Sequence, residues 1–222
     1  MNNSDVFRFR VMNAIRLMKL GRQRRRLFGI PGPKFIITLV CLLWFGALTL
    51  RADTHYVSLD GTNNSPYLNW ADAATQIQWA VNVAGVDDTV LVSNGTYNLT
   101  NQINILTNIT VQSLYGTNDP SKLAIINGNY PANTNRCVYM KTGALDGFTI
   151  SNGFYIGPEV GGGGILITNS GSVFNCLIYG NSVSNVPDLV SSGGGGIYMY
   201  NGGIVSNCTI LSNTACASPS YL

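Results

Sequence analysis

The sequence predicts a parallel β-solenoid, and a repeat of fixed length is the first observation behind that fold class. Segment 161–181 returns 32 residues later as 193–213, and 12 of its 21 positions are identical, including the opening block GGGGI. The second observation is that glycine and asparagine divide each copy into short β-type runs, which no helical period fits. A fixed period with β-rich content is typical of a stacked array of coils.

Each copy contains two runs that we expect to be strands. They are Ile165–Thr168 and Val173–Ile178 in the first copy, and Ile197–Tyr200 and Val205–Ile210 in the second. Equivalent residues should lie on adjacent coils about 4.8 Å apart, with backbone hydrogen bonds between the coils. The inward residues Val173, Cys176 and Ile178 would then lie over Val205, Cys208 and Ile210. The 11 residues Ser182–Ser192 are expected to leave the column as an outward loop.

A weaker copy at residues 137–153 adds a third coil. Val138–Met140 matches Ile197–Met199, and Phe148–Ile150 matches Cys208–Ile210 if one residue is deleted between the two matches. Phe148 then occupies the cysteine position, which indicates that this position requires an apolar filler rather than sulfur chemistry. A second outward loop is expected at Phe154–Val160.

Residues 1–52 differ from the rest of the chain in charge and are expected to direct export. They hold ten Lys or Arg and one acid, and an apolar run from Phe35 to Leu50 follows the basic block. Sixteen helical residues span about 24 Å, short of the roughly 30 Å hydrocarbon core of a membrane. The pattern favours a secretory signal peptide cleaved after Ala52. An uncleaved inner-membrane anchor, residues 35–50, with a cytoplasmic basic tail is the alternative.

Residues 53–222 are acidic, with three Lys or Arg against nine acids and a formal charge of −6 (3 − 9). They hold no basic patch, so we do not expect nucleic-acid binding. Cys176 and Cys208 would be stacked neighbours, and we expect small buried side chains there rather than a disulfide. The cysteines and the single histidine lack the spacing of a zinc site.

Residues 53–100 are expected to form a strand, a helix and the first strand of the column. Thr54–Leu59 and Thr89–Ser93 have β-type patterns. The helix Trp70–Ala84 presents an apolar stripe at three-to-four spacing, with Asn69 as its N-cap. A solenoid leaves the backbone groups and core of its first coil uncovered, and an amphipathic helix laid across that end covers both.

Residues 101–222 are assigned to the coils of the column. Further strands are expected at Ile103–Ile105, Ile109–Leu114 and Leu123–Asn127. A third GGGGI would be due at position 225, so we expect a column truncated at its C-terminus.

Two stretches resemble known families. The run ATQIQWAVNVAGVDDTVLVSNGTY (Ala74–Tyr97) resembles the N-terminal cap and first coil of pectin-lyase-like right-handed parallel β-helix proteins. The GGGGI…CxIxxN pattern is similar to the repeats of chlamydial-type polymorphic outer membrane proteins, which are marked by GGAI and FxxN. Here Gly replaces Ala in the first motif, and Ile178 and Ile210 replace Phe in the second. The resemblance implies a right-handed β-helix, a scaffold that serves many unrelated functions.

Enzymes on this scaffold that cleave polysaccharides use clustered carboxylates, sometimes with calcium, and an Arg or Lys base. The chain offers one adjacent acidic pair, Asp87–Asp88, which we interpret as a turn at the helix exit. Asp146 is expected to point outward and to form a surface ion pair with Lys141 or Arg136. Neither position supplies the two carboxylates that flank a scissile glycosidic bond.

Single charged residues and the glycine blocks also have structural interpretations. Glu159 and Asp188 are expected to be solvated loop charges, and His55, the lone histidine, has no predicted partner. The glycine blocks at 161–164 and 193–196 lack the Lys-Ser/Thr of a phosphate loop, and we expect turns with positive φ.

Polar and aromatic side chains recur at matched positions of the two copies. The pairs Asn169/Asn201 and Asn181/Asn213 are expected to form stacked amide ladders at coil corners. Tyr198 and Tyr200 offer an aromatic face for sugar stacking, although packing within the protein is the favoured interpretation.

The sequence therefore predicts no catalytic, cofactor-binding or metal-binding residue. The leading hypothesis is an exported, non-catalytic β-helix, secreted or on the cell surface or outer membrane, that is adhesin-like or structural. Its expected partners are extracellular polysaccharides or cell-surface components. The alternative is a pectate-lyase-like lyase or glycoside hydrolase whose catalytic coils lie beyond residue 222. A scaffold anchored in the inner membrane is a third hypothesis.

Overall fold

The computed structural model describes residues 51–117, 119–157, 161–185 and 193–216, and these residues are mostly β. They belong to one structural unit, Arg51–Leu222. Residues 1–50, which hold most of the predicted signal or anchor and its apolar run at residues 35–50, lie outside the described residues.

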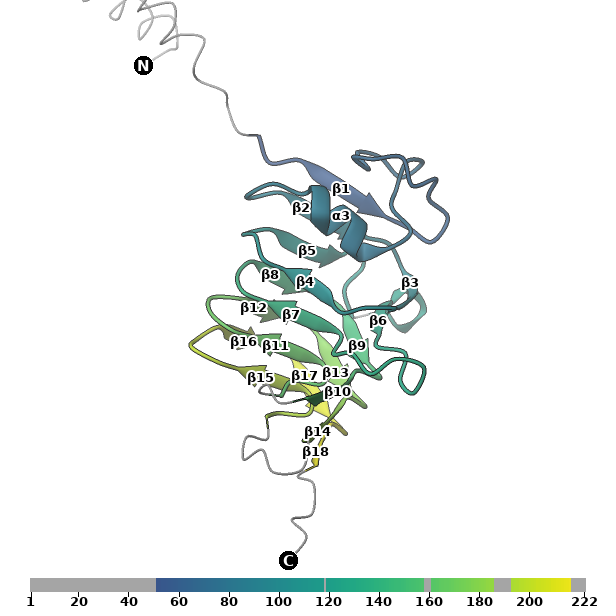
Figure 1. Cartoon of the computed structure of the whole chain (residues 1–222). Coiled ribbons are helices and arrows are strands. Elements are labelled where there is room, and N and C mark those ends of the chain that lie inside the picture. The colour runs from purple at the N-terminus through teal and green to yellow at the C-terminus, as the bar shows by residue number, and fades with distance from the viewer. Residues whose placement is uncertain (1–50, 118, 158–160, 186–192, 217–222) are drawn as a thin grey trace, which may run out of the picture. The chain divides into compact units, whose positions relative to one another are not determined.

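Four sheets make up this unit, and every strand pairing described within them is parallel (Figure 1). Sheet I consists, in spatial order, of β1 (Thr54–Val57), β2 (Thr89–Val92), β5 (Thr110–Ser113), β8 (Ala144–Asp146), β12 (Ser172–Phe174) and β16 (Ile204–Ser206). Sheet II consists of β3 (Gly95–Asn98), β6 (Ala124–Asn127), β9 (Thr149–Ser151), β13 (Leu177–Tyr179) and β17 (Thr209–Leu211).

Two further sheets complete the set. Sheet III consists of β4 (Ile103–Ile105), β7 (Val138–Met140), β11 (Ile165–Ile167) and β15 (Ile197–Met199). Sheet IV consists of β10 (Phe154–Gly157), β14 (Ser182–Asn185) and β18 (Thr214–Cys216).

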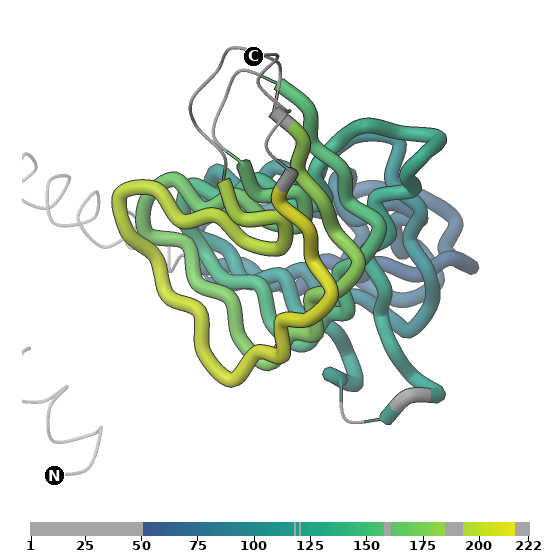
Figure 2. Tube along the Cα trace, turned by 90° about the horizontal axis from the view of Figure 1, so that it is seen from below, coloured from purple at the N-terminus to yellow at the C-terminus, as the bar shows by residue number. Residues whose placement is uncertain are grey.

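Consecutive strands belong to different sheets, so the chain passes from sheet to sheet and returns beside its own earlier coil. One such coil runs through β7, β8, β9 and β10, and the next through β11, β12, β13 and β14. Seen from below, successive coils lie over one another (Figure 2). This arrangement of parallel sheets is compatible with a β-helix or solenoid.

The register confirms the predicted repeat. Ile165 pairs with Ile197, and Val173 pairs with Val205, both at the predicted offset of 32. The upstream coil also shows the predicted one-residue deletion. Val138 pairs with Ile165, whereas Ala144 pairs with Ser172, so the later coil has one more residue between these two positions. The offset thus changes from 27 to 28 between sheet III and sheet I (165 − 138 and 172 − 144).

Each run that we predicted as one strand over Val173–Ile178 or Val205–Ile210 is instead two strands with a corner between them. The corner residues Asn175 and Asn207 have φ values of 51° and 52°. A left-handed residue turns the chain out of the plane of one sheet and into the next, and asparagine tolerates this conformation better than most residues. The β-type composition of the run concealed the corner.

The segments Phe154–Val160 and Ser182–Ser192, which we predicted to be outward loops, each begin with a strand. Their first four residues form β10 and β14, which pair in register from Phe154 with Ser182 to Gly157 with Asn185. The remaining residues of these two segments, 158–160 and 186–192, lie outside the described residues. Parallel backbone pairing between successive coils therefore extends into two segments that we had assigned to loops.

The glycine blocks were predicted as turns with positive φ, and this is wrong for most of their residues. Within the two blocks, only Gly162 lies in that region, at φ 87°. The glycines permit close packing instead, because a Cβ on Gly163 would overlap the backbone oxygen of Ser182 at the start of β14. A Cβ on Gly164 would lie 2.6 Å from the backbone oxygen of Gly196 on the next coil.

The helix is shorter than predicted. Helix α3 spans Ile77–Val83 rather than Trp70–Ala84, and it packs against β1, β2 and β4. Asn69 does not cap it. Its side-chain oxygen accepts a hydrogen bond from the backbone N–H of Asp72 at 3.0 Å, within a turn that precedes the helix. A short 3₁₀ turn, η1 (Pro120–Lys122), is the other helical element described.

The core is a set of inward columns that run through the stacked coils. Sheet II contributes a column of fully or almost fully buried residues, Tyr97, Ile126, Ile150 and Ile178. Phe148 is fully buried beside it in the position that Cys176 takes on the next coil, which confirms the predicted apolar filler. The alternate residues of the same strands range from exposed, as Tyr179 is, to buried, as Thr149 and Ser151 are.

Candidate functional site

The structure brings together His55 and Asp88, which we had not predicted to interact. The expectation that His55 has no partner is wrong, because its Nε2 lies 3.0 Å from Oδ2 of Asp88. Its Nδ1 lies 2.7 Å from the backbone oxygen of Pro66. Both side chains are buried, with His55 4% and Asp88 8% exposed.

The hydrogen bonds around Asp88 keep its carboxyl group ionised. Burial raises the pKa of Asp88, but the hydrogen bonds from the Asp53 N–H, the His55 ring and the Gly85 N–H outweigh it, so the pKa lies below its ordinary value. The two ring nitrogens of His55 thus face a backbone carbonyl oxygen and a carboxylate, both of which accept hydrogen bonds.

This buried pair joins the start of β1 to the residue before β2. The hydrogen bond between the two side chains links segments that are 33 residues apart in the sequence. Asp88 therefore occupies a structured turn, as predicted for the Asp87–Asp88 pair. Asp87 is exposed and accepts a hydrogen bond from Nδ2 of Asn108 at 2.9 Å.

Asp146 does not form the surface ion pair that we predicted with Lys141, since no such pair is found among the described residues. Its Oδ1 instead accepts a hydrogen bond from Nδ2 of Asn175 at 2.7 Å. Asn207 continues this line and donates from Nδ2 to Oδ1 of Asn175 at 2.6 Å. The guanidinium of Arg136, the other predicted partner, lies over the ring of Tyr155, 3.9 Å from its centroid.

One of the two predicted asparagine ladders is confirmed. Asn181 Nδ2 donates to Oδ1 of Asn213 at 3.0 Å and to the backbone oxygen of Ile150 at 3.0 Å. Asn181 Oδ1 accepts from the backbone N–H of Gly153 at 2.9 Å, so this buried amide satisfies three neighbouring groups. The other prediction is wrong, because Asn169 and Asn201 form no hydrogen bond with each other.

The cysteines of the two repeats are stacked neighbours, as predicted, and their thiols are free. A hydrogen bond between the two thiols, together with burial, raises the pKa of Cys176 well above the ordinary thiol value. The same hydrogen bond lowers the pKa of Cys208 to about 6. Cys137 lies apart from this pair, and burial raises its pKa to about 12.

An open cleft on the outer face of sheet III is the strongest candidate for a binding site. It has a volume of about 720 Å³. Its lining consists of four amides, one arginine and two tyrosines: Asn101, Gln102, Asn104, Asn135, Arg136, Tyr139 and Tyr155. No carboxylate from the described residues lines it, so this cleft lacks the acid–base pair of a glycosidase.

The strand register explains how these residues meet. Asn104 on β4 pairs with Tyr139 on β7, and both alternate with buried neighbours, so both side chains point outward. Tyr155 comes from β10 in sheet IV. Asn104 is held by two contacts, since its backbone N–H donates to Oε1 of Gln78 at 2.7 Å and its Oδ1 accepts from Nε2 of Gln102 at 2.8 Å.

The cleft was missed at the sequence level, although part of the pattern was visible. Tyr139 aligns with Leu166 and Tyr198 in one outward column, and this alignment can be read from the repeat. The repeat does not show that β10 lies beside this cleft, because we assigned Phe154–Val160 to a loop. Tyr198 and Tyr200, for which sugar stacking was the alternative to packing within the protein, do not line this cleft.

Several predictions cannot be placed on the structure. Glu159 and Asp188 lie outside the described residues, as do most of the predicted signal or anchor and the C-terminal residues 217–222. Within the described part of the chain, no helix has both the length and the hydropathy required for a membrane span. No three His, Cys, Asp or Glu side chains gather there in a way that suits a metal ion.

The comparisons with known proteins found no matching family model, curated protein or solved structure.

Proposed function

We propose that this chain is an exported, non-catalytic, right-handed parallel β-helix that binds extracellular polysaccharide as a secreted or cell-surface protein. The observation that carries the proposal is the amide- and tyrosine-lined cleft on sheet III. Amide side chains donate to and accept from sugar hydroxyls, and tyrosine rings stack on the apolar faces of pyranose rings. The right-handed winding follows from the resemblance to pectin-lyase-like proteins.

The same resemblance supports a capping role for α3 at the N-terminal end of the column. Ile77, Ala80 and Val81 form its buried face, and Trp79 and Val83 are exposed on the other. Such a helix covers core residues that would otherwise contact water.

Export is supported by the basic block and the apolar run 35–50 that follows it. Cleavage after Ala52 would release the β-rich part, whereas an uncleaved segment would keep it anchored in the inner membrane. N-terminal sequencing of the exported protein decides between them. A mature N-terminus at Asp53 supports release, and retention of residues 35–50 supports the anchor.

The binding experiment uses the full chain and a panel of neutral and acidic 1,4-linked hexasaccharides, measured by isothermal titration calorimetry. We expect Tyr139→Ser to weaken binding in the cleft by about tenfold, because a stacked ring contributes roughly 1–1.5 kcal/mol. Tyr179→Ser is the matched control, since Tyr179 points outward from sheet II and lies outside the cleft. No binding to any panel member would overturn the proposal.

The enzymatic alternative has a separate measurement. A polysaccharide lyase produces unsaturated uronate ends that absorb ultraviolet light, and a hydrolase releases reducing ends. We expect neither product from polygalacturonate or the neutral oligosaccharides, because no pair of carboxylates faces the cleft among the described residues. Appearance of either product would replace the binding proposal with the enzymatic one.

A further inference from the structure

Helix α3 carries apolar side chains on both of its faces. Ile77, Ala80 and Val81 are buried, whereas Trp79 and Val83 on the opposite face are 38% and 39% exposed. Residues four apart are neighbours on a helix surface, so the indole ring and the valine form one apolar surface, the outer face of α3. A surface helix of a soluble protein typically turns polar residues to water, so this outer face calls for an apolar partner.

More exposed apolar side chains occur in the segments that flank α3. Val86, three residues beyond the helix, is 63% exposed, and Leu68 and Trp70 before it are 50% and 39% exposed. The ring of Trp70 packs edge-on against Tyr56 of β1, with 4.6 Å between the ring centroids. Figure 1 shows β1, α3 and the segment 58–76 together at the end of the stack of strands that begins with β1. Exposed apolar side chains therefore gather at the N-terminal end of the column.

The two amide side chains beside the outer face of α3 are already bonded within the protein. Gln78 Oε1 accepts from the backbone N–H of Asn104 at 2.7 Å, and Gln78 Nε2 donates to Oδ1 of Asn82 at 2.7 Å. Helix α3 itself contains no charged residue. Removing such a surface from water costs little, because desolvation is expensive mainly for charges and for polar groups that lose their hydrogen bonds.

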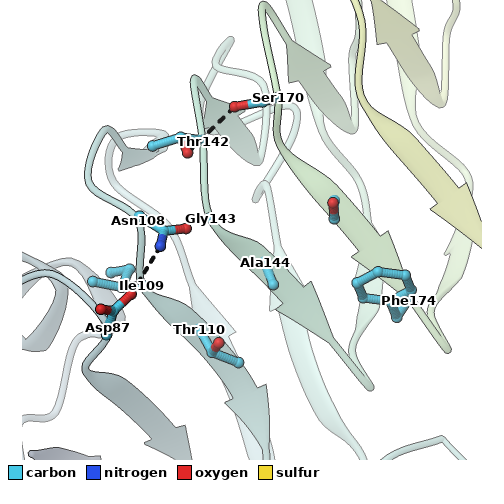
Figure 3. Close-up of a pocket in the computed structure, with 10 residues that line it drawn as sticks. Asp87, Asn108, Ile109, Thr110, Thr142, Gly143, Ala144, Ser170 and Phe174 are labelled. Atoms are coloured by element: carbon cyan, nitrogen blue, oxygen red, sulfur yellow. Dashed lines mark hydrogen bonds between the residues drawn. The ribbon is translucent and has the colours of Figure 1, made fainter. Parts of the chain in front are cut away.

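The charges around this end of the column select against an anionic partner. Residues 51–88 hold one arginine and five aspartates, a formal charge of −4 (1 − 5). Asp87 directly follows Val86, and Figure 3 shows its carboxylate accepting a hydrogen bond from Asn108 at the end of an open groove on sheet I. The surface thus suits an apolar partner without net charge. The headgroup region of a zwitterionic bilayer has this chemistry, and tryptophan is enriched there.

The sequence of the chain indicates how a bilayer reaches this end. The apolar run 35–50 is separated from β1 by only three residues, because β1 begins at Thr54. The last of the three, Asp53, is fixed by its backbone oxygen, which accepts from the Thr89 N–H at 2.9 Å. Three extended residues span about 10 Å. A membrane that holds the run is therefore within that reach of β1, against which α3 packs.

We infer that the outer face of α3 docks onto the headgroup region of a zwitterionic phospholipid bilayer, the membrane that residues 35–50 enter. The inference rests on the export part of the proposed function and is independent of glycan binding. Trp79 lies with its ring among the headgroups, and Val83 lies beside it. A three-residue tether gives this face a high effective concentration at the bilayer, so a small apolar contact is sufficient to orient the column.

The test uses the full chain reconstituted into phosphatidylcholine vesicles, with phosphatidylcholine brominated near the headgroup as a quencher of tryptophan fluorescence. Trp44→Phe together with Trp70→Phe leaves Trp79 as the sole tryptophan. The matched control adds Trp79→Phe and Tyr179→Trp, which moves the tryptophan to a position on sheet II that is also 38% exposed. Circular dichroism spectra and unfolding midpoints verify that both proteins fold.

We expect the brominated lipid to reduce Trp79 emission by at least about twofold and to leave the tryptophan at position 179 unquenched. Val83→Asp in the Trp79-only chain places a charge on the outer face of α3 and should remove most of the quenching. Replacing half of the phosphatidylcholine with phosphatidylglycerol at low salt should weaken it, because the aspartates repel anionic headgroups. Stronger quenching in the anionic vesicles would overturn the zwitterionic assignment.

Four further outcomes are decisive. Equal quenching at positions 79 and 179, or undiminished quenching in V83D, would overturn the inference. A blue-shifted Trp79 emission without lipid quenching would mean that a second copy of the chain covers this face, and would also overturn it. Vesicles that fail to retain the chain would overturn both the membrane anchor and the docking. Calorimetry that shows no glycan binding, with Trp79 quenching intact, would overturn the proposed binding function alone.

Discussion

Coil 161–185 and coil 193–216 are identical at 12 of the 21 positions that align in 161–181 and 193–213, yet their equivalent inward residues differ in burial. Ile178 is fully buried, whereas its register partner Ile210 is 51% exposed. Ile167 is fully buried, and its partner Met199 is 42% exposed. The first coil is paired on both sides, and the second has a paired coil on one side only among the described residues. Burial in such a column is therefore provided by the neighbouring coils and not by a coil's own sequence.

The contacts that each coil makes with itself are alike in the two coils, because they do not depend on a neighbouring coil. The backbone oxygen of Ser182 lies where a Cβ on Gly163 would be, and the backbone oxygen of Thr214 has the same relation to Gly195. The two kinds of feature should respond differently to matched substitutions, and the predictions below use that difference.

The largest difference between the coils is expected for the inward isoleucines. Ile178→Ala leaves a cavity in a close-packed core and should lower the free energy of unfolding by about 3–4 kcal/mol. Ile210→Ala removes a half-exposed side chain and should cost less than about 1 kcal/mol. Urea denaturation of both variants measures the difference. Equal losses would show that Ile210 is covered in solution.

The paired cysteines should differ in their rate of alkylation. The thiolate is the reactive form, and the pKa of about 6 at Cys208 makes it prevail at pH 7 while Cys176 stays protonated. We expect iodoacetamide to modify Cys208 more than tenfold faster than Cys176, with a rate that rises as the pH increases through about 6. Peptide mass spectrometry of samples taken at timed intervals measures the fraction of Cys176 and of Cys208 that is alkylated.

A variant isolates the cause of this difference. Cys176→Ala removes the hydrogen-bond donor, so the alkylation of Cys208 should shift toward the ordinary thiol range near pH 8.5. An unchanged pH profile in this variant would contradict the role of the hydrogen bond.

The asparagine ladder should show a smaller difference. Asn181→Ala leaves the Gly153 N–H and the Ile150 carbonyl without their partner in a site that is 1% exposed, which should cost about 2 kcal/mol. Asn213→Ala acts in a half-buried site where water can replace part of the amide, so we expect about 1 kcal/mol. Thermal unfolding compares them, with Asn169→Ala as an exposed control that should leave the midpoint unchanged.

The glycines should show the smallest difference between the coils. Gly163→Ala and Gly195→Ala each force a Cβ against a backbone oxygen of the same coil, and the Cβ on Gly163 would also lie 2.7 Å from the backbone oxygen of Gly195 on the next coil. Both variants should destabilise by on the order of 2 kcal/mol, with the larger loss at Gly163. Gly85→Ala is the control, since its Cβ would meet only ordinary contacts. A much smaller loss at Gly195 would mean that the outer coil relaxes around the added methyl group.

The sequence by itself determined the repeat, its register and the inward columns. It placed Val173 over Val205, predicted a one-residue deletion between Met140 and Phe148 and assigned Phe148 to the cysteine position, and the pairing confirms these predictions. It also predicted the ladder of Asn181 and Asn213. A stacked column repeats the same contact at a fixed offset, so the periodicity of the chain encodes those contacts directly.

Only the tertiary structure decided the features that join unlike segments. The pairing of His55 with Asp88 links residues 33 apart that have no repeat relationship, and the sheet III cleft requires β10, which its sequence did not distinguish from a loop. The glycine blocks were recognised as special, but the reason is the backbone that passes beside them. Contacts of this kind depend on where the chain returns in space, and a single sequence without periodicity at those positions does not specify it.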